Sequence, residues 1–575
     1  MTDVTSKPSS DVSTNVPSVS DPYQLSADNV KEPPKGLFES LKYIGPGFIL
    51  SASIVGSGEL IATTILGARA GFVLLWFIIF SCIVKVAVQL EFGKHAISTG
   101  ESTMASLNKL PGPKLGRANW SIWTWLLLMT AKMLQVGGIV GGVVMALEQM
   151  MPALEPLRVV MTFVVAASVS LIVYRGFYGV IEKASLVMIS LFTVFTIASL
   201  VSLQWTDKAI TASEITSGMM PNIPQEIRVV APANESGSSY TVESVAVPEQ
   251  TDLAEDAALI VLKNEAQETV EVVSPADGTL NSIAVKPGDT IEPGGLLAVL
   301  GSTALIFIAI GAFGITGVGG DEIMAYNYWL IEKGYAAYVG PKDESEGWLH
   351  RAKGWIKIMY LDALLSMVAY TLMTAMFYVL GAAVLNRMGE VPANEELVSS
   401  LSKMYTVTLG SGAKTTFLIG AIVVLYSTLM AALAAWSRLF SDSFGRIGLY
   451  SFEDQKARGT AIAIFAWVIP AIWGALFLTF QAPGWMVIIG GVATTVILLI
   501  VVFAAMIFRY RRLDPRLKPT MFYDLCLWLS VIAISLVALQ LLKKVVDDTR
   551  KLISPPAATA TIESAEPIRL ERQES

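Results

Sequence analysis

Charged and reactive residues are scarce in this chain of 575 residues. Only 15% of the residues are charged and 53% are hydrophobic, and the mean hydropathy is +0.57. A soluble domain has about 25% charged residues, so the composition excludes an ordinary soluble protein. The chain has two cysteines and two histidines, which excludes a disulfide scaffold and a His/Cys metal cluster. No basic patch and no nucleotide-binding glycine loop occur, so we expect neither nucleic-acid binding nor ATP hydrolysis.

Long apolar runs make up most of the remaining sequence. Eleven of them are long enough to cross the bilayer as helices, which takes about 20 apolar residues. The first ten fall into two groups of five, and an odd number of crossings gives the second group the opposite orientation. Two inverted five-helix units are an architecture of secondary transporters. The runs lie near residues 44–68, 71–92, 120–150, 157–175, 181–204, 302–331, 356–385, 414–440, 459–480, 485–508 and 521–542.

The runs and the polar segments between them predict six parts of an all-α membrane protein with a small β insertion. Lys and Arg concentrate in alternate short loops, which predicts a multi-pass protein of the cell membrane with a cytoplasmic N-terminus. The side of the C-terminal tail stays open. The parts are a disordered cytoplasmic tail (1–36), a first five-helix repeat (37–204), an outer β domain (205–300), a second five-helix repeat (301–512), an eleventh helix (513–545) and a disordered tail (546–575).

The first run of each unit has a glycine cluster at its centre, followed by carboxylates. One cluster runs from Gly56 to Glu59, and the other from Gly317 to Asp321 and Glu322. Each glycine costs ~1 kcal/mol relative to alanine inside a helix. We therefore expect both helices to be interrupted there. Unwinding frees the carbonyls of Gly56 and Gly317, which is tolerated at membrane depth only beside a cavity or a ligand.

The carboxylates at these positions predict a cation site. A carboxylate at the bilayer centre costs ~2.5–3.5 kcal/mol, and equivalent positions of inverted repeats converge. We expect Glu59, Asp321 and Glu322 to coordinate a divalent cation, because hard oxygen ligands suit Mg²⁺, Ca²⁺ or Mn²⁺. The alternative is that the glycines serve close helix packing and the carboxylates cap half-helices.

Two further charged residues inside the runs are candidates for coupling transport to an ion gradient. Lys132 lies in the third run and Asp362 in the seventh. A buried ionisable group can carry a proton, and a lysine can replace a coupling cation electrostatically. The alternative is that each takes part in an internal ion pair.

Several short motifs resemble the Nramp family of divalent metal transporters. The resemblance implies a leucine-transporter-like fold, with a 5+5 inverted repeat plus one extra helix. It also implies proton-linked import of Mn²⁺ or Fe²⁺, with no attached cofactor and the metal as cargo. The matching residues are Gly45-Pro46-Gly47-Phe48, Gly67-Ala68, Ala70-Gly71, Leu75-Trp76, Gln89, Thr99-Gly100 and Asp362.

The site motifs depart from the family pattern. The family's Asp-Pro-Gly-Asn in the first helix is replaced by Gly56-Ser57-Gly58-Glu59, and its Met-Pro-His in the sixth helix by Gly319-Gly320-Asp321. The ligand aspartate and the soft thioether that favours transition metals are therefore missing. This resembles a divergent branch of the family and adds a harder ion such as Mg²⁺ to the candidate cargoes.

The insertion at 205–300 is acidic and internally repeated. It holds 15 acidic and 4 basic residues, a net charge of −11. Val229–Ala233 matches Val272–Ala276, and β-rich runs alternate with Pro-Gly turns, so we expect a small β domain. The pattern resembles the biotinyl/lipoyl domain, a flattened barrel of two halves. Ala266 stands where that family has its modified lysine, so we expect no covalent biotin or lipoate. We expect instead a structural or protein-binding module outside the cell.

These observations predict a secondary active transporter, not an enzyme. Its cargo would be a divalent metal cation, driven by a proton or Na⁺ gradient. One alternative keeps the fold and changes the cargo to amino acids or other small organic solutes. A biotin-dependent decarboxylase pump is disfavoured by Ala266. A sensor that transports nothing is the fourth possibility.

Overall fold

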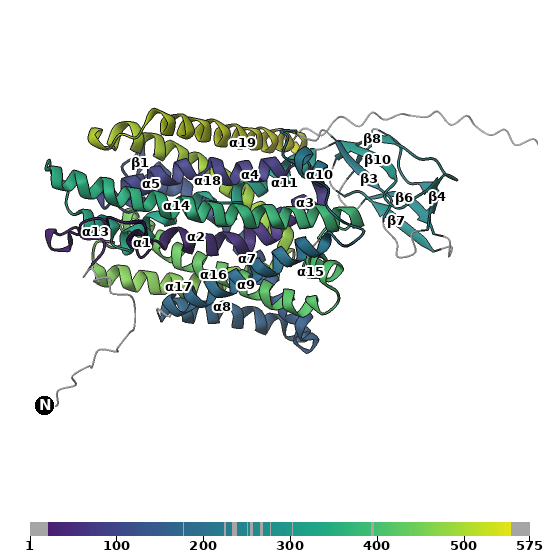
Figure 1. Ribbon diagram of the computed structural model, residues 1–575, viewed down its shortest axis with the longest axis horizontal. Coiled ribbons are helices and arrows are strands. Elements are labelled where there is room, and N and C mark those ends of the chain that lie inside the picture. Colours follow the sequence, from purple (N-terminus) through teal and green to yellow (C-terminus); the bar gives the residue numbers. More distant parts are fainter. Residues whose placement is uncertain are drawn as a thin grey trace, which may run out of the picture.

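The computed structural model is a long helical bundle with a β domain at one end (Figure 1). It describes residues 21–175, 178–222, 226–232, 238–249, 251–253, 257–264, 268–275, 278–301, 303–392 and 396–553.

The helices of the bundle follow the predicted runs. In the described part of the chain, nine helices are long and apolar enough to cross a membrane. The first unit contains α2 (Pro46–Ile54), η2 (Val55–Thr63), α3 (Thr64–Ala70), α4 (Leu75–Val84), α5 (Val86–Thr99), α7 (Trp120–Met150), α8 (Arg158–Tyr174) and α9 (Tyr178–Leu203). The second contains α11 (Thr303–Ile315), α12 (Gly320–Glu332), α14 (Glu346–Leu380), α16 (Ala413–Ile447), α17 (Gln455–Phe480) and α18 (Pro483–Ile507), and α19 (Met521–Ile553) follows.

The first helices of the two units lie against each other at the centre of the bundle. α2 packs on α12, and η2 packs on α11. The start of one helix therefore meets the end of the other, so the two run antiparallel. This is the relation that inverted repeats require. The all-helical membrane fold with a β insertion is thus confirmed.

The two glycine clusters have different structures. The second helix is interrupted, since α11 ends at Ile315 and α12 begins at Gly320. The prediction of an interruption in the first helix is wrong. Residues Val55–Thr63 form a π-helix, which keeps backbone hydrogen bonds while widening the turn. The glycines of this segment allow the wide turn to approach its neighbours.

The β domain is built from two halves of equal design. Its two four-stranded sheets have the orders β3-β10-β8-β5 and β7-β6-β4-β9, so exchanging β3–β6 with β7–β10 converts one sheet into the other. The predicted sequence repeat is thus a repeat of structure. The strands are β3 (Glu226–Val230), β4 (Tyr240–Val245), β5 (Asp252–Leu253), β6 (Ala258–Lys263), β7 (Thr269–Val273), β8 (Gly278–Ile283), β9 (Thr290–Ile291) and β10 (Leu296–Gly301).

The likeness to a biotinyl/lipoyl domain stays a prediction. Ala266, the position of the modified lysine in that family, lies outside the described residues. Lys263, the nearest lysine along the chain, ends β6 and pairs with Glu243 of β4 at 2.7 Å. This lysine is therefore held against the face of the sheet by an acidic neighbour.

Both predicted tail boundaries are wrong. Residues 21–36 are ordered although 1–36 was expected to be disordered, and residues 1–20 lie outside the described part. At the other end α19 continues to Ile553, past the predicted boundary at 545. The average composition of residues 1–36 is polar. It does not show that the second half carries apolar and aromatic side chains that pack on the bundle.

Residues 21–35 form a strap across the end of the bundle opposite the β domain. Tyr23 donates a hydrogen bond to Glu332 of α12 at 2.7 Å, and its ring lies 5.4 Å from that of Phe452. Asp21 pairs with Arg458 of α17 at 2.8 Å. The strap therefore connects the central helix α12 with α17 of the surrounding helices.

Asp21→Asn should lower the thermal melting temperature of the purified protein. Asp21 and Arg458 are 8% and 6% exposed, and removing one partner of a buried ion pair costs about 3–5 kcal/mol. Asp28→Asn is the matched control, because Asp28 lies on the exposed side of the same strap. Equal melting temperatures for both variants would contradict a stabilising role of the Asp21–Arg458 pair.

Candidate functional site

The break between α11 and α12 lies at the centre of the bundle. Gly317 adopts a left-handed φ of +61°, which a glycine adopts without steric cost. A Cβ at this position would lie 2.9 Å from the Cα of Cys82 in α4. The glycine is therefore required by the backbone turn and by the approach of α4.

The π-helix approaches its neighbours even more closely. A Cβ at Gly56 would lie 2.0 Å from Thr428 Oγ1 and 2.7 Å from the carbonyl oxygen of Val424, both on α16. A Cβ at Gly58 would lie 2.5 Å from the carbonyl oxygen of Ile315. Close packing therefore accounts for these glycines. The predicted role of the Gly56 and Gly317 carbonyls as ligands stays a prediction.

Glu59 reaches from the π-helix to the break. It is fully buried, and its Oε1 accepts a hydrogen bond from the Gly317 N–H at 2.9 Å. Its Oε2 has no hydrogen-bond partner among the described residues. A buried carboxylate oxygen without a partner is energetically unfavourable, so this atom is the first candidate ligand at the break.

Lys85 binds the other end of the break. Its ammonium donates to the carbonyl oxygen of Phe313 at 2.6 Å and to that of Thr316. These carbonyls belong to the last turn of α11, where the helix dipole favours a positive charge. Lys85 thus caps the C-terminal end of α11.

Asp321 lies at the start of α12 and is neutralised by Lys132. The ammonium of Lys132 lies 2.6 Å from Asp321 Oδ1 and 2.7 Å from Thr494 Oγ1. The indole N–H of Trp436 donates to Asp321 Oδ2 at 2.9 Å. Both oxygens of Asp321 therefore have partners, and its charge is balanced by a side chain of α7.

Glu322 is less completely paired. Its Oε2 lies 4.0 Å from the Lys132 ammonium and has no hydrogen-bond partner among the described residues. A cavity of about 20 Å³ lies beside it, between α2, α7, α12 and α16, large enough for a water molecule. Lys132, Asp321, Glu322, Trp436, Gln135 and Thr428 contribute its polar lining.

The structure does not bring Glu59, Asp321 and Glu322 into one group. Within the described ranges, no set of three His, Cys, Asp or Glu side chains is placed to hold a metal ion. Lys132 takes up the charge of Asp321, and Glu59 faces the Gly317 N–H. The predicted three-carboxylate centre is thus divided between two clusters, each accompanied by a lysine.

Asp362 lies away from both clusters and caps α2. It accepts hydrogen bonds from the N–H groups of Gly45 at 2.8 Å and Gly47 at 2.6 Å, and from the Tyr326 hydroxyl at 2.9 Å. A carboxylate at a helix N-terminus is favoured by unpaired N–H groups and the dipole. The contacts therefore account for Asp362 as a cap, and its role in coupling stays a prediction.

Two residues that complete the Asp321 cluster could not be identified from sequence patterns. Trp436 and Asp321 are 115 positions apart, and Thr494 and Lys132 are 362 positions apart. Neither residue belongs to a motif. An isolated tryptophan or threonine in an apolar run is indistinguishable from ordinary packing.

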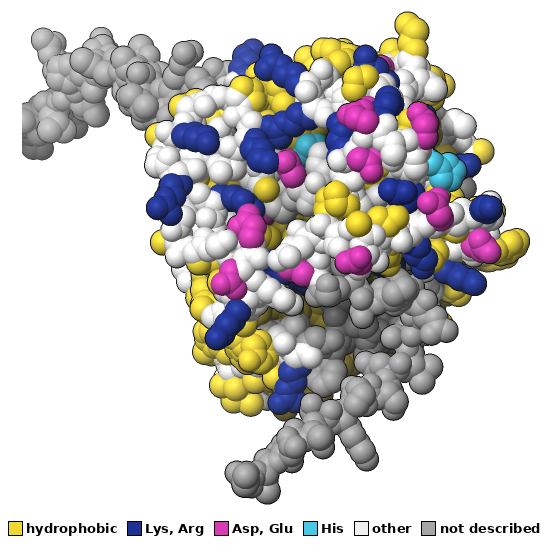
Figure 2. All heavy atoms as spheres, turned by 90° about the vertical axis from the view of Figure 1, so that its left-hand side faces the viewer, with side chains coloured by type: hydrophobic (Ala, Val, Ile, Leu, Met, Phe, Trp, Pro, Cys, Tyr) yellow, Lys and Arg dark blue, Asp and Glu magenta, His cyan; other side chains and the backbone are white. Residues whose placement is uncertain are grey.

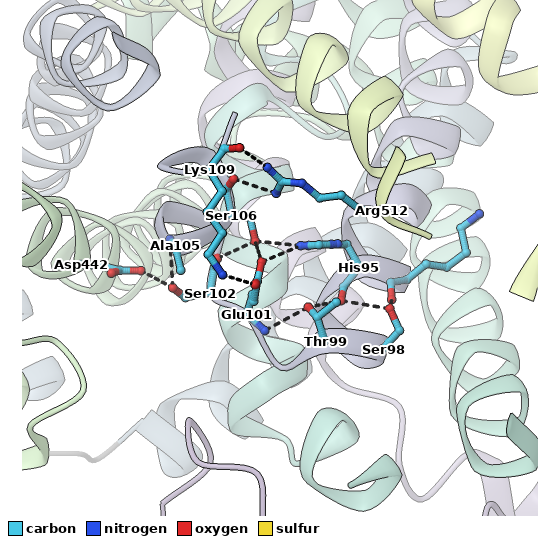
Figure 3. A network of polar contacts seen from close by, with 11 residues as sticks. His95, Ser98, Thr99, Glu101, Ser102, Ala105, Ser106, Lys109, Asp442 and Arg512 are labelled. Atoms are coloured by element: carbon cyan, nitrogen blue, oxygen red, sulfur yellow. Dashed lines mark hydrogen bonds and ion pairs between the residues drawn. The ribbon is translucent and has the colours of Figure 1, made fainter. Parts of the chain in front are cut away.

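A second polar network lies where α5 meets α6 (Thr103–Leu107) (Figure 3). Burial raises the pKa of Glu101, but hydrogen bonds from His95 and Lys109 lower it to about 2. Ser102 donates to Asp442 of α16 at 2.5 Å. The carboxylates of Glu101 and Asp442 already accept hydrogen bonds from several donors. The network therefore connects helix ends, and neither carboxylate is left available to a cation.

Gly317→Ala should destabilise the protein, because the left-handed conformation costs roughly 1–2 kcal/mol for a residue with a Cβ and Cys82 blocks the added atom. Gly459→Ala is the control. Gly459 lies in α17 with nothing within 4 Å of an added Cβ, so alanine should stabilise the helix by up to ~1 kcal/mol. Thermal melting of both variants measures the difference, and a Gly317→Ala protein as stable as wild type would refute the packing argument.

Comparisons with known proteins agree with this architecture. Residues 47–231 match the family model described as natural resistance-associated macrophage protein-like, or Nramp. No curated protein matches the sequence. The fold is similar to crystal structures of the Eremococcus coleocola manganese transporter. A histidine-to-alanine and a glutamate-to-glutamine mutant each give a TM-score of 0.57 at 13% identity, covering 93% of this chain and 94% of theirs.

A complex of the same transporter with an aromatic bis-isothiourea substituted compound gives a TM-score of 0.53 at 13% identity, covering 94% of this chain and 93% of that chain. At this identity the likeness shows the fold alone. The family model adds a relationship in sequence over the first repeat. Residues 47–231 are thus similar in sequence to the Nramp family, and the bundle has the fold of a bacterial manganese transporter.

Proposed function

We propose that the protein is a secondary active transporter that carries a divalent metal cation past the break between α11 and α12. The observation that carries this proposal is the pair of carboxylate oxygens Glu59 Oε2 and Glu322 Oε2. Both are buried at the break without a hydrogen-bond partner in the described part of the chain. Burying a charge is costly unless it is paired, and a cation supplies the missing partner.

The cavity beside Glu322 is the proposed binding position. Glu322 and Asp321 supply hard carboxylate oxygens to it. Mg²⁺ and Mn²⁺ both accept oxygen ligands and retain water. The manganese transporter with this fold supports Mn²⁺, whereas the absence of a thioether in the Gly319-Gly320-Asp321 motif supports the harder Mg²⁺.

We propose the proton, not Na⁺, as the coupling ion. The carbonyls at the end of α11 are the kind of group that binds Na⁺ in broken helices. Two of them, those of Phe313 and Thr316, already accept hydrogen bonds from Lys85. The cationic position at the break is thereby taken by the protein itself.

We also propose that the N-terminus is cytoplasmic. Figure 2 shows many Lys and Arg side chains on the end of the bundle away from the β domain. Basic loops favour the cytoplasmic side. The N-terminal strap lies at this same end, and the β domain would then face outward.

A small zwitterionic solute such as an amino acid is a second candidate cargo. The cavity holds both a carboxylate pair and the Lys132 ammonium, a mixed set of charges that suits a zwitterion. No three-carboxylate metal group occurs in the ranges that the structure describes. Competition by amino acids for uptake would favour this candidate.

Glu59→Gln and Glu322→Gln should each reduce Mn²⁺ or Mg²⁺ uptake into proteoliposomes by at least about tenfold, the effect of ~1.4 kcal/mol. Each variant keeps the side-chain shape but removes a charge. Glu155→Gln is the control, since this glutamate is exposed and lies away from the break, in the turn before α8. Full activity in both test variants would contradict the proposed site. Uptake driven by an imposed proton gradient, and not by a Na⁺ gradient, is the expected coupling.

A further inference from the structure

We propose that Lys132 is a tethered competitor of the transported cation. Its ammonium occupies the Asp321–Glu322 carboxylate pair when no cargo is bound, and it leaves Asp321 when a cation enters. This inference rests on the proposed function and assigns Lys132 as the residue that sets which cations the site accepts.

The contacts of Lys132 place its charge where the cargo would bind. The residue is 1% exposed, and its ammonium lies 2.6 Å from Asp321 and 4.0 Å from Glu322. The same two carboxylates line the cavity. Since a metal ion at these oxygens would lie within a few ångströms of the ammonium, like charges exclude simultaneous occupation.

The side chain has a second partner that can hold it after displacement. Thr494 Oγ1 accepts from the Lys132 ammonium at 2.7 Å and donates its own proton to the carbonyl oxygen of Gly490 at 2.9 Å. The lysine stem is flexible, so the ammonium can keep its bond to Thr494 while it leaves Asp321. No proton has to be lost for this exchange.

The exchange makes Lys132 a selectivity filter. A monovalent cation offers Asp321 and Glu322 no more charge than the ammonium that it must displace. A divalent cation offers twice that charge. Removal of the ammonium should therefore both tighten divalent binding and allow Na⁺ to compete for the pair.

Lys85 provides a matched comparison inside the same protein. It is fully buried like Lys132, but its ammonium bonds the backbone carbonyl oxygens of Phe313 and Thr316. Among the described residues, no carboxylate oxygen lies within 4.0 Å of its ammonium. Neutralising Lys85 removes a helix cap and leaves the Asp321–Glu322 pair unchanged.

The test measures Mn²⁺ affinity of the purified full chain by calorimetry at one fixed pH. Lys132→Gln and Lys132→Met remove the competing charge and should bind Mn²⁺ tighter by between about 5-fold and about 150-fold, the usual range of coupling between sites. Lys132→Arg keeps the charge, and its guanidinium can bind a carboxylate through two N–H groups at once. This variant should therefore bind Mn²⁺ at least about 5-fold more weakly than wild type. Lys85→Gln should not bind tighter than wild type.

The outcomes separate this inference from the proposed function. Wild type that binds Mn²⁺, with Lys132→Gln and Lys132→Met binding no tighter, overturns the competitor role and leaves transport intact. Tighter binding by Lys132→Arg also overturns it, even if the neutral variants do not fold. Failure of wild type and every variant to bind Mn²⁺ or Mg²⁺ overturns the proposed function and this inference with it. NaCl should inhibit Mn²⁺ binding more strongly in Lys132→Gln than in wild type. This result would support the role of Lys132 in selectivity.

Discussion

The structure depends on how charged side chains are balanced in its buried interior. Acidic groups from η2 and α12 lie in two clusters near the break at the centre of the bundle, where an unpaired charge is costly. Lys132 balances Asp321 directly, while Glu59 and Glu322 each keep one oxygen without a partner among the described residues. This incomplete balance is the observation from which we propose a cation site at the centre.

The fold supplies the two backbone features that create this centre. The break before Gly320 exposes the N–H of Gly317 to Glu59 and the last carbonyls of α11 to Lys85. The π-helix opposite keeps its own backbone paired and approaches α16 closely through Gly56. The helix of the second unit is therefore interrupted between α11 and α12 and presents polar backbone groups. Its counterpart in the first unit stays continuous and has a wider turn at η2. The inverted repeat gives related positions different tasks.

The sequence was sufficient to predict the helices and the break but not the pairing of charges. Apolar runs and glycine clusters are local signals, and they identified the break near Gly317 and the carboxylates beside it. The partner of Asp321 could not be predicted, because Lys132 lies 189 positions away and many folds would separate the two. The π-helix was not predicted, because glycines indicate a weak helix but do not show whether the helix is interrupted or forms a wider turn. The ordered strap was not predicted, because the average composition of residues 1–36 is polar and does not distinguish its two halves.

The central claim is that a divalent cation completes the charge balance at Glu322 and displaces Lys132. Anomalous diffraction from crystals grown with Mn²⁺ tests it most directly, because the metal is located independently of any assay. The account predicts an anomalous peak in the cavity at the Glu322 carboxylate, with the Lys132 ammonium moved away from Asp321. A peak elsewhere in the bundle, with the Lys132–Asp321 ion pair intact, would contradict it.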